Sequence, residues 1–292
     1  MVGMRRVGQV VLMLLVLLTL GVCDGTPSVD QPPAGLAGDA QGDFGAPDRS
    51  DAVEGSRGSD AEVPHERPPL AGYWAQRRFY SSLSDLPVLG MKETSTTSIS
   101  LVKIEEHENG QLTLVTTLCG IDIDNGAEGM VDVLVPDAFV RSIPQATLSA
   151  TLTREERGWR FFQPRHFDVR GAVLESKADE SLPVDVDDPR VFDQDEDGEP
   201  GVTMIVTGLT QGRLFIVQRT SYELDGFVVS DLLIEGRADW TDEQVLLASD
   251  NPNLTGSPPK TPKLEASTFT MLRLTGEPDC NTAREALRAK TP

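Results

Sequence analysis

Apolar and polar residues alternate along most of the chain beyond residue 70, and this period of two is typical of strands. In "TSISLVKIEEH" (97–107), Ile99 and Leu101 fall on one face, and Val102 falls on the other. The pattern resumes at 112–124 after Asn109-Gly110, a pair that favours a tight hairpin turn. Further strands are predicted at 70–80, 131–136, 146–153, 159–163, 166–175, 202–209, 213–224, 227–240, 244–249 and 267–276.

Short strands separated by turns such as "TQG" (210–212) and "LDG" (224–226) predict an all-β fold. The spacing fits either an antiparallel barrel or a sandwich, and it leaves both open. Two short helices are expected, at 136–143 and at 280–289, the second with Asp279 or Asn281 as its N-cap. The proline-rich segment 252–264 predicts an irregular loop, because proline interrupts both helices and central strands.

The N-terminal region differs in composition from the rest of the chain. Arg5 and Arg6 precede the apolar run "VVLMLLVLLTLGV", which indicates a secretion signal at 1–22. The run is shorter than the roughly 20 residues that a membrane-spanning helix needs. Residues 23–68 hold ten acids, three arginines and few large apolar side chains, so we expect a disordered acidic tether. The β-rich domain is then 69–292.

The residues around Cys23, "LTLGVCDG", resemble the lipobox of bacterial lipoproteins, with Val22 in place of the usual small residue. The resemblance implies that Cys23 becomes a lipidated N-terminus, and that its acyl chains anchor the protein to a membrane of the cell envelope. Signal cleavage nearby, which would leave a soluble exported protein, is the alternative. Asp24 follows Cys23 directly but does not decide to which membrane the protein is anchored. The periplasmic face and the outer-surface face both stay open.

The two remaining cysteines, Cys119 and Cys280, predict a disulfide if the protein is exported into an oxidising compartment. Two separate buried thiols are the alternative. A bridge between them would fasten the end of the chain to an early strand.

The stretch "DQDEDGEPG" (193–201) places Asp193, Asp195 and Asp197 on alternate positions before Gly198. It resembles the first half of an EF-hand loop, in which alternate carboxylates surround calcium and glycine permits a sharp turn. The resemblance implies a structural calcium ion, with the backbone carbonyl of Glu199 as a further ligand.

The match to that loop is incomplete, because Met204 occupies the position of the usual twelfth-position acid. Remaining ligands would have to come from elsewhere, for instance from Asp185, Asp187 or Asp188. An acidic surface turn without an ion is the alternative.

Gly72-Tyr73-Trp74 opens the first predicted strand and resembles the Gly-x-Trp motif of lipocalins. The resemblance implies a ligand-binding barrel in which Trp74 closes one end beneath an arginine from the last strand, here Arg273. A buried core aromatic without that role is the alternative for Trp74. The combination of lipobox, acidic tether and Asp-rich loop resembles uncharacterised bacterial surface lipoproteins.

Catalytic motifs are not evident, so we expect no enzyme. The three histidines show no metal-ligand spacing, and His166 and Asp168 are interpreted as a surface ion pair. A formal net charge of −20 without a basic stripe argues against nucleic-acid binding. The leading hypothesis is a lipid-anchored envelope protein whose barrel binds an apolar small ligand. A module that contacts envelope proteins is the second hypothesis, and a hydrolase is the third.

Overall fold

The computed structural model describes residues 66–86, 90–126, 130–254, 258 and 260–289. The chain divides into two units, Met1–Gly58 and Ser59–Pro292, and all described residues belong to the second. The predicted signal segment 1–22, Cys23 and the tether up to residue 65 therefore lie outside the described residues. Within the described part, no helix is long and apolar enough to cross a membrane.

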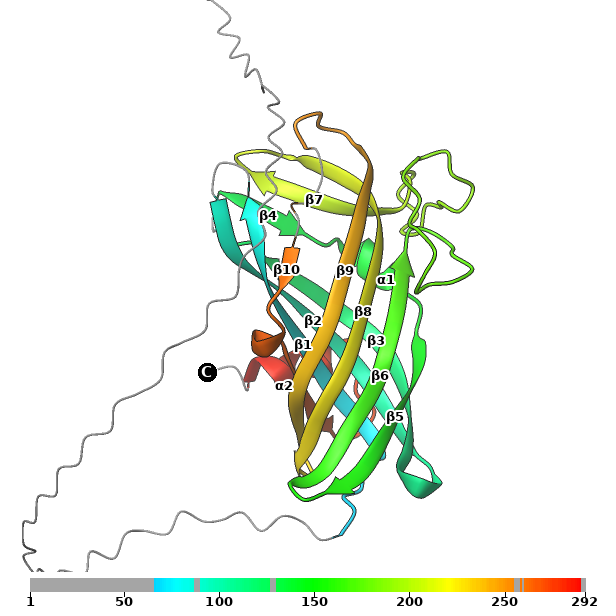
Figure 1. Cartoon of the computed structure of the whole chain (residues 1–292), viewed down its shortest axis with the longest axis vertical. Coiled ribbons are helices and arrows are strands. Elements are labelled where there is room, and N and C mark those ends of the chain that lie inside the picture. The colour runs from blue at the N-terminus through cyan, green and yellow to red at the C-terminus, as the bar shows by residue number, and fades with distance from the viewer. Residues whose placement is uncertain (1–65, 87–89, 127–129, 255–257, 259, 290–292) are drawn as a thin grey trace, which may run out of the picture. The chain divides into compact units, whose positions relative to one another are not determined.

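Eight antiparallel strands close into a barrel (Figure 1). Each strand pairs with the next of the eight along the chain, and the last pairs back with the first. The predicted all-β fold is confirmed, and the closed ring makes it a barrel. The eight strands are β1 (Gly72–Leu86), β2 (Gly90–Glu106), β3 (Gln111–Asp124), β5 (Ala146–Glu155), β6 (Gly158–Arg170), β8 (Gly212–Ser230), β9 (Leu233–Ser249) and β11 (Thr268–Leu274).

Smaller elements are attached to this ring. Strand β4 (Val131–Leu134) pairs with β7 (Val202–Gly208), and β7 pairs with the start of β8, so the sheet extends beyond the barrel. The remaining elements are the 3-10 turns η1 (Glu108–Gly110) and η2 (Leu264–Ala266), helices α1 (Asp137–Ser142) and α2 (Cys280–Ala289), and strand β10 (Lys260–Pro262). Both predicted helices are thus present, and Asp279 caps α2 by accepting from the Thr282 N–H at 2.8 Å.

The barrel wall is incomplete between β3 and β6. Strand β5 pairs with β3 only from Gln111 to Thr116, so β3 continues to Asp124 without β5 beside it. Helix α1 packs against β3. Ile121 of β3 and Val140 of α1 line the same surface groove. The short helix therefore covers the part of the wall that β5 does not reach.

The barrel interior changes from apolar to polar along its length. On β1 the inward positions run from Trp74 through Gln76 to Arg78, and all three side chains are buried. Their partners on β2 are Val102, then Ser100 and Ser98. At the end of the barrel where β1 begins, drawn lower in Figure 1, buried apolar side chains form one cluster, among them Trp74, Ile104, Leu114, Phe161, Leu224 and Phe269. We call this cluster the lower core.

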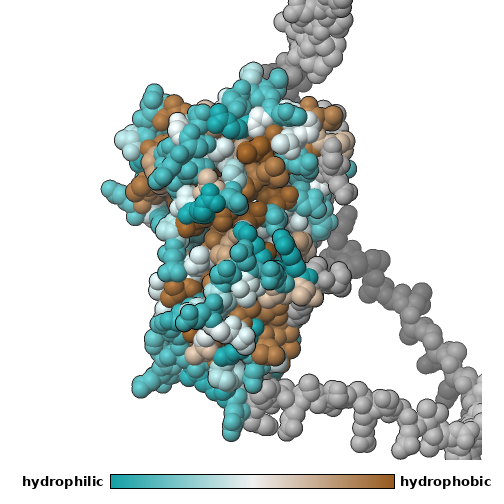
Figure 2. All heavy atoms as spheres, turned by 180° about the vertical axis from the view of Figure 1, so that it is seen from behind, coloured by the Kyte–Doolittle hydropathy of each residue, from teal (hydrophilic) through white to brown (hydrophobic). Residues whose placement is uncertain are grey.

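Helix α2 packs outside the ring, against β1, β2, β3 and β11. Its buried Ala283 and Leu287 lie in a small apolar cluster with Ala75 and Ile99. Seen from behind, the surface is mostly hydrophilic, with apolar side chains gathered in a few areas (Figure 2).

The turn predicted at "LDG" (224–226) is wrong, because β8 continues through it to Ser230. Gly226 instead lies opposite Gly236 on β9, where an added Cβ would come within 2.3 Å of the Glu235 carbonyl oxygen. The glycine serves the close approach of two strands. Segments 227–240 and 244–249, which were expected as separate strands, are divided differently, with β9 spanning Leu233–Ser249.

The loop predicted at 252–264 is wrong in part, because β10 lies within it. Residues Lys260–Pro262 pair with Ser82–Ser84 at the end of β1. Proline is tolerated there because a three-residue edge strand does not need every backbone donor.

Candidate functional site

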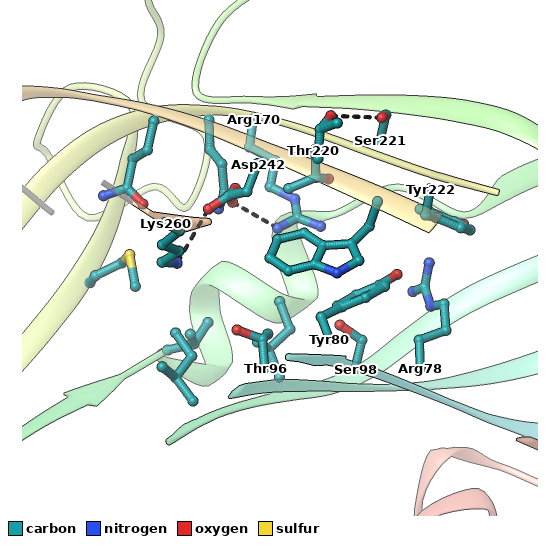
Figure 3. Close-up of a pocket in the computed structure, with 18 of the residues that line it drawn as sticks. Arg78, Tyr80, Thr96, Ser98, Arg170, Thr220, Ser221, Tyr222, Asp242 and Lys260 are labelled. Carbon is teal, nitrogen blue, oxygen red and sulfur yellow. Dashed lines mark hydrogen bonds and ion pairs between the residues drawn. The ribbon is translucent and has the colours of Figure 1, made fainter. Parts of the chain in front are cut away.

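A cavity of about 60 Å³ lies in the polar part of the barrel interior (Figure 3). A space of roughly 15 Å³ on this measure holds one water molecule, so the cavity has room for a few waters or a small chemical group. Its polar lining includes Arg78, Tyr80, Arg170, Gln218, Asp242 and Lys260, and its apolar lining includes Ile121, Ile123, Val135, Phe139, Met204 and Trp240.

Arg78 on β1 is only 6% exposed and points into this cavity. Its Nη2 donates to the Ser100 hydroxyl at 3.3 Å, and its guanidinium lies 4.1 Å from the centre of the Tyr222 ring (Figure 3). Its Nε is buried and has no hydrogen-bond partner among the described residues. Burial lowers the pKa of Arg78, but Tyr222, Tyr80 and Asp168 oppose this, and the net shift is upward.

Arg170 on β6 reaches the same cavity. Its Nη1 donates to Gln218 Oε1 at 2.9 Å, and its guanidinium lies 5.7 Å from the centre of the Phe139 ring of α1. Its Nε is also buried without a partner in the described part of the chain. Burial lowers the pKa of Arg170, and Asp168 and Asp242 offset this only in part.

A polar chain connects Arg170 to the third cation. Gln218 Nε2 donates to Asp242 at 2.7 Å, and Lys260 Nζ lies 3.3 Å from the other oxygen of Asp242 (Figure 3). Lys260 comes from β10, so the strand that the sequence did not predict supplies one wall of the site.

His166 and Asp168 form the pair that the sequence predicted, but the pair is half-buried instead of lying on the surface. Both are half-buried on β6, at the same parity as Arg170, with 3.0 Å between His166 Nε2 and Asp168 Oδ1. Burial raises the pKa of Asp168, but His166, Arg170 and Arg78 outweigh it and hold the pKa at about 2. An irregularity between Gln163 and His166 shifts the register of β6, which sets this parity.

Two tyrosines beside Arg78 are neutral hydrogen-bonding groups at ordinary pH. Burial raises the pKa of Tyr80 to about 12, and it also raises the pKa of Tyr222. The Tyr80 ring packs against Trp240, with 5.2 Å between ring centres. The aromatic groups thus form the boundary between the cavity and the lower core.

The acidic loop brings the three predicted aspartates together. One carboxylate oxygen from each of Asp193, Asp195 and Asp197 lies within 4.8 Å of the others, so this cluster could hold a metal ion. Asp193 accepts from the Gly198 N–H at 2.8 Å, and Gly198 has the positive φ of 87° that favours glycine.

Asp195 is the member of this cluster that most needs a positive partner. It is 9% exposed, and its Oδ2 accepts from the Thr203 N–H at 3.0 Å. Its Oδ1 is buried and has no partner among the described residues. Burial raises the pKa of Asp195, and the carboxylates of Asp197 and Asp193 raise it further. A bound cation would reverse each of these penalties.

The neighbouring acids are occupied elsewhere. The Glu199 carboxylate pairs with Arg213 at 3.0 Å and is not part of the cluster. Asp188 pairs with Arg190 at 2.7 Å, and this hydrogen bond holds the pKa of Asp188 at about 2. Asp185 accepts from the Asp187 N–H in a local turn.

The other predicted residues also have clear positions. Arg273 lies over Trp74, with 5.3 Å from its guanidinium carbon to the centre of the ring. Cys119 on β3 and Cys280 at the start of α2 form a disulfide. Cys23 lies outside the described residues.

The sequence interpretation missed Arg78 and Arg170. A signal was present, because Trp74, Gln76, Arg78 and Tyr80 share one strand parity. An arginine at the parity of a buried tryptophan is unusual enough to indicate a polar interior.

Comparisons with protein-family models, with curated proteins and with solved structures found no match.

Proposed function

We propose that this is an exported, lipid-anchored envelope protein whose barrel binds a small ligand with an apolar part, and whose acidic loop binds calcium. The observation that carries the first half is a cavity inside the barrel, next to the apolar lower core. Small-molecule sites typically combine apolar walls with a few convergent polar groups, and the lining of this cavity has that mixture.

The ligand is tested by native mass spectrometry of the mature protein, compared with its mass after organic extraction. Ser98 is buried and lines the cavity, so Ser98→Phe should fill the space and abolish a small-molecule adduct. Ser149→Phe on β5 is the matched control, because Ser149 is exposed. An adduct that persists in Ser98→Phe would place the ligand elsewhere.

The calcium proposal is supported by the orphaned, buried Oδ1 of Asp195 beside two further carboxylates. Oxygen-only ligands suit a hard cation, and the ion would fasten the long segment between β6 and β7. An incomplete set of acids predicts a dissociation constant of about 10⁻⁴–10⁻³ M. At 10 mM calcium, this affinity stabilises the fold by roughly 1.4–2.7 kcal/mol.

Calorimetric titration with calcium tests this proposal. Asp195→Asn should abolish the binding heat and the stabilisation, whereas Asp132→Asn should keep both. Asp132 is exposed on β4 and outside the cluster, so it matches the charge change. Equal calcium binding by both variants would show that the ion binds elsewhere and that the loop is an acidic turn without an ion.

The anchor is tested separately by the mass of the mature N-terminal peptide. Acylated Cys23 should appear there, and Cys23→Ser should release the protein from the membrane fraction. An unmodified N-terminus near this position would support the soluble alternative.

An interaction module is the second candidate, because the segment between β6 and β7 exposes large apolar side chains. Val173 is 67% exposed and Val184 is 77% exposed. Val186 and Phe192 of the same segment are each 41% exposed, and a patch built by such side chains would favour a protein contact. A barrel without ligand, together with crosslinking to envelope proteins that Val173→Ser/Val184→Ser removes, would favour this function.

A further inference from the structure

We propose that the barrel takes the carboxylate end of an apolar acid, which it binds between Arg78 and Arg170. The inference rests on the proposed ligand-binding function and adds the chemical class of the ligand. It is carried by two buried guanidinium groups that line one cavity.

The charges around the cavity do not balance. Arg78, Arg170 and Lys260 are cationic, whereas the nearby carboxylates are Asp242, which lines the cavity, and Asp168 beside it. Asp242 pairs with Lys260, and Asp168 pairs with His166. Neither Arg78 nor Arg170 has a carboxylate within ion-pair distance among the described residues. The two arginines and Lys260 together exceed these two carboxylates by one positive charge.

Each of these arginines also has a donor without a partner. The Nε atoms of Arg78 and Arg170 are both buried and unpaired in the described structure. Leaving a charged donor unpaired inside a protein is costly, and the cost disappears when an anion supplies the missing acceptor.

The balance of charge favours a monoanion, and a carboxylate matches the planar donors of a guanidinium. A phosphate dianion would exceed the single uncompensated charge. Ile121, Phe139 and Met204 form an apolar part of the lining, against which the carbon chain of the acid would pack. The volume of about 60 Å³ suits the carboxylate and a few carbon atoms, so we expect short acids to fit best.

Isothermal titration calorimetry on the mature protein, delipidated by organic extraction and refolded in calcium, tests the class of ligand. Sodium hexanoate is the probe, 1-hexanol is the neutral match, and inorganic phosphate is an anion without an apolar chain. We expect hexanoate to bind at least tenfold more tightly than either of the other two.

Variants then locate the site. Arg78→Gln and Arg170→Gln should each weaken hexanoate binding at least tenfold and leave 1-hexanol binding unchanged. Arg160→Gln on β6 is the control, because Arg160 pairs with Asp225 instead of lining the cavity. Far-ultraviolet circular dichroism checks that each variant is folded, and the comparison of hexanoate with hexanol needs no variant.

Each result has a separate meaning. Equal binding of hexanoate and 1-hexanol would overturn the carboxylate site but leave the apolar-ligand function standing. Phosphate binding as tight as hexanoate binding would overturn the apolar acid as the class. No binding of any probe, and no adduct on the native protein, would remove both the inference and the proposed function. Unchanged hexanoate binding in both arginine variants would also overturn the inference.

Discussion

Arg273 on β11 covers the face of Trp74 on β1 and ties down the chain that enters the barrel. Its Nη1 and Nη2 donate to the backbone carbonyls of Pro69 and Ala71, each at 2.5 Å, while the Trp74 Nε1 donates to Leu70 at 2.8 Å. One side chain of the last strand is thus bonded to the chain that leads into the first strand, at the end of the barrel that holds the lower core.

Replacing Arg273 should destabilise this end of the barrel. Arg273→Ala removes three charged hydrogen bonds, the one to Asp231 being long at 3.4 Å, and a cation–π contact, so we expect a loss of roughly 2–3 kcal/mol in the free energy of unfolding. Urea denaturation measures it, with Arg141→Ala on the exposed surface of α1 as the control. Equal stability of the two variants would show that the contacts of Arg273 do not stabilise the fold.

The disulfide should contribute more than any single contact, because it joins positions 161 residues apart. The chain-entropy model gives about 5 kcal/mol for such a loop, and native-state relaxation reduces this to roughly 3–5 kcal/mol. Cys119→Ser/Cys280→Ser should lose that amount in urea unfolding, and reduced wild-type protein should behave alike. An intact mass without the loss of two hydrogens would contradict the bridge.

The strand pattern predicted the all-β fold, the Asn109-Gly110 hairpin and both helices, because one-sided burial and turn chemistry are local properties. The boundary between β8 and β9 failed for a non-local reason. Gly226 does not mark a turn: glycine is needed there because two strands approach closely, and only the pairing with Gly236 reveals this.

The candidate sites divide in the same way. Asp193, Asp195 and Asp197 were predictable, since their spacing in one loop already brings the carboxylates together. The cavity was not predictable, because Arg78 and Arg170 come from strands far apart in sequence and arginine is ordinarily exposed. Their meeting depends on barrel closure and on the register shift in β6.

Asp168 should make stability depend on acid pH. Its pKa is about 2 in the folded protein and near 3.8 when unfolded, so its contribution is present above about pH 4 and is lost as the pH falls through about 2. The shift corresponds to roughly 2 kcal/mol. Asp168→Asn should therefore be less stable than wild type at pH 6, and the gap should narrow towards pH 3. Urea melts across this range measure it, and a constant gap would contradict the mechanism.

Substitutions at two glycines of the acidic loop should distinguish the cost of backbone strain from the cost of steric overlap. Gly198 has a φ of 87° and open space where a Cβ would stand, whereas Gly201 has a φ of 84° and would place its Cβ 2.2 Å from the Ile216 carbonyl oxygen on β8. Gly198→Ala should cost about 1 kcal/mol from the left-handed backbone alone. Gly201→Ala should cost at least about 3 kcal/mol, because the loop must also leave β8. Thermal unfolding of the pair measures the difference, and similar costs would mean that the loop does not depend on its contact with the barrel.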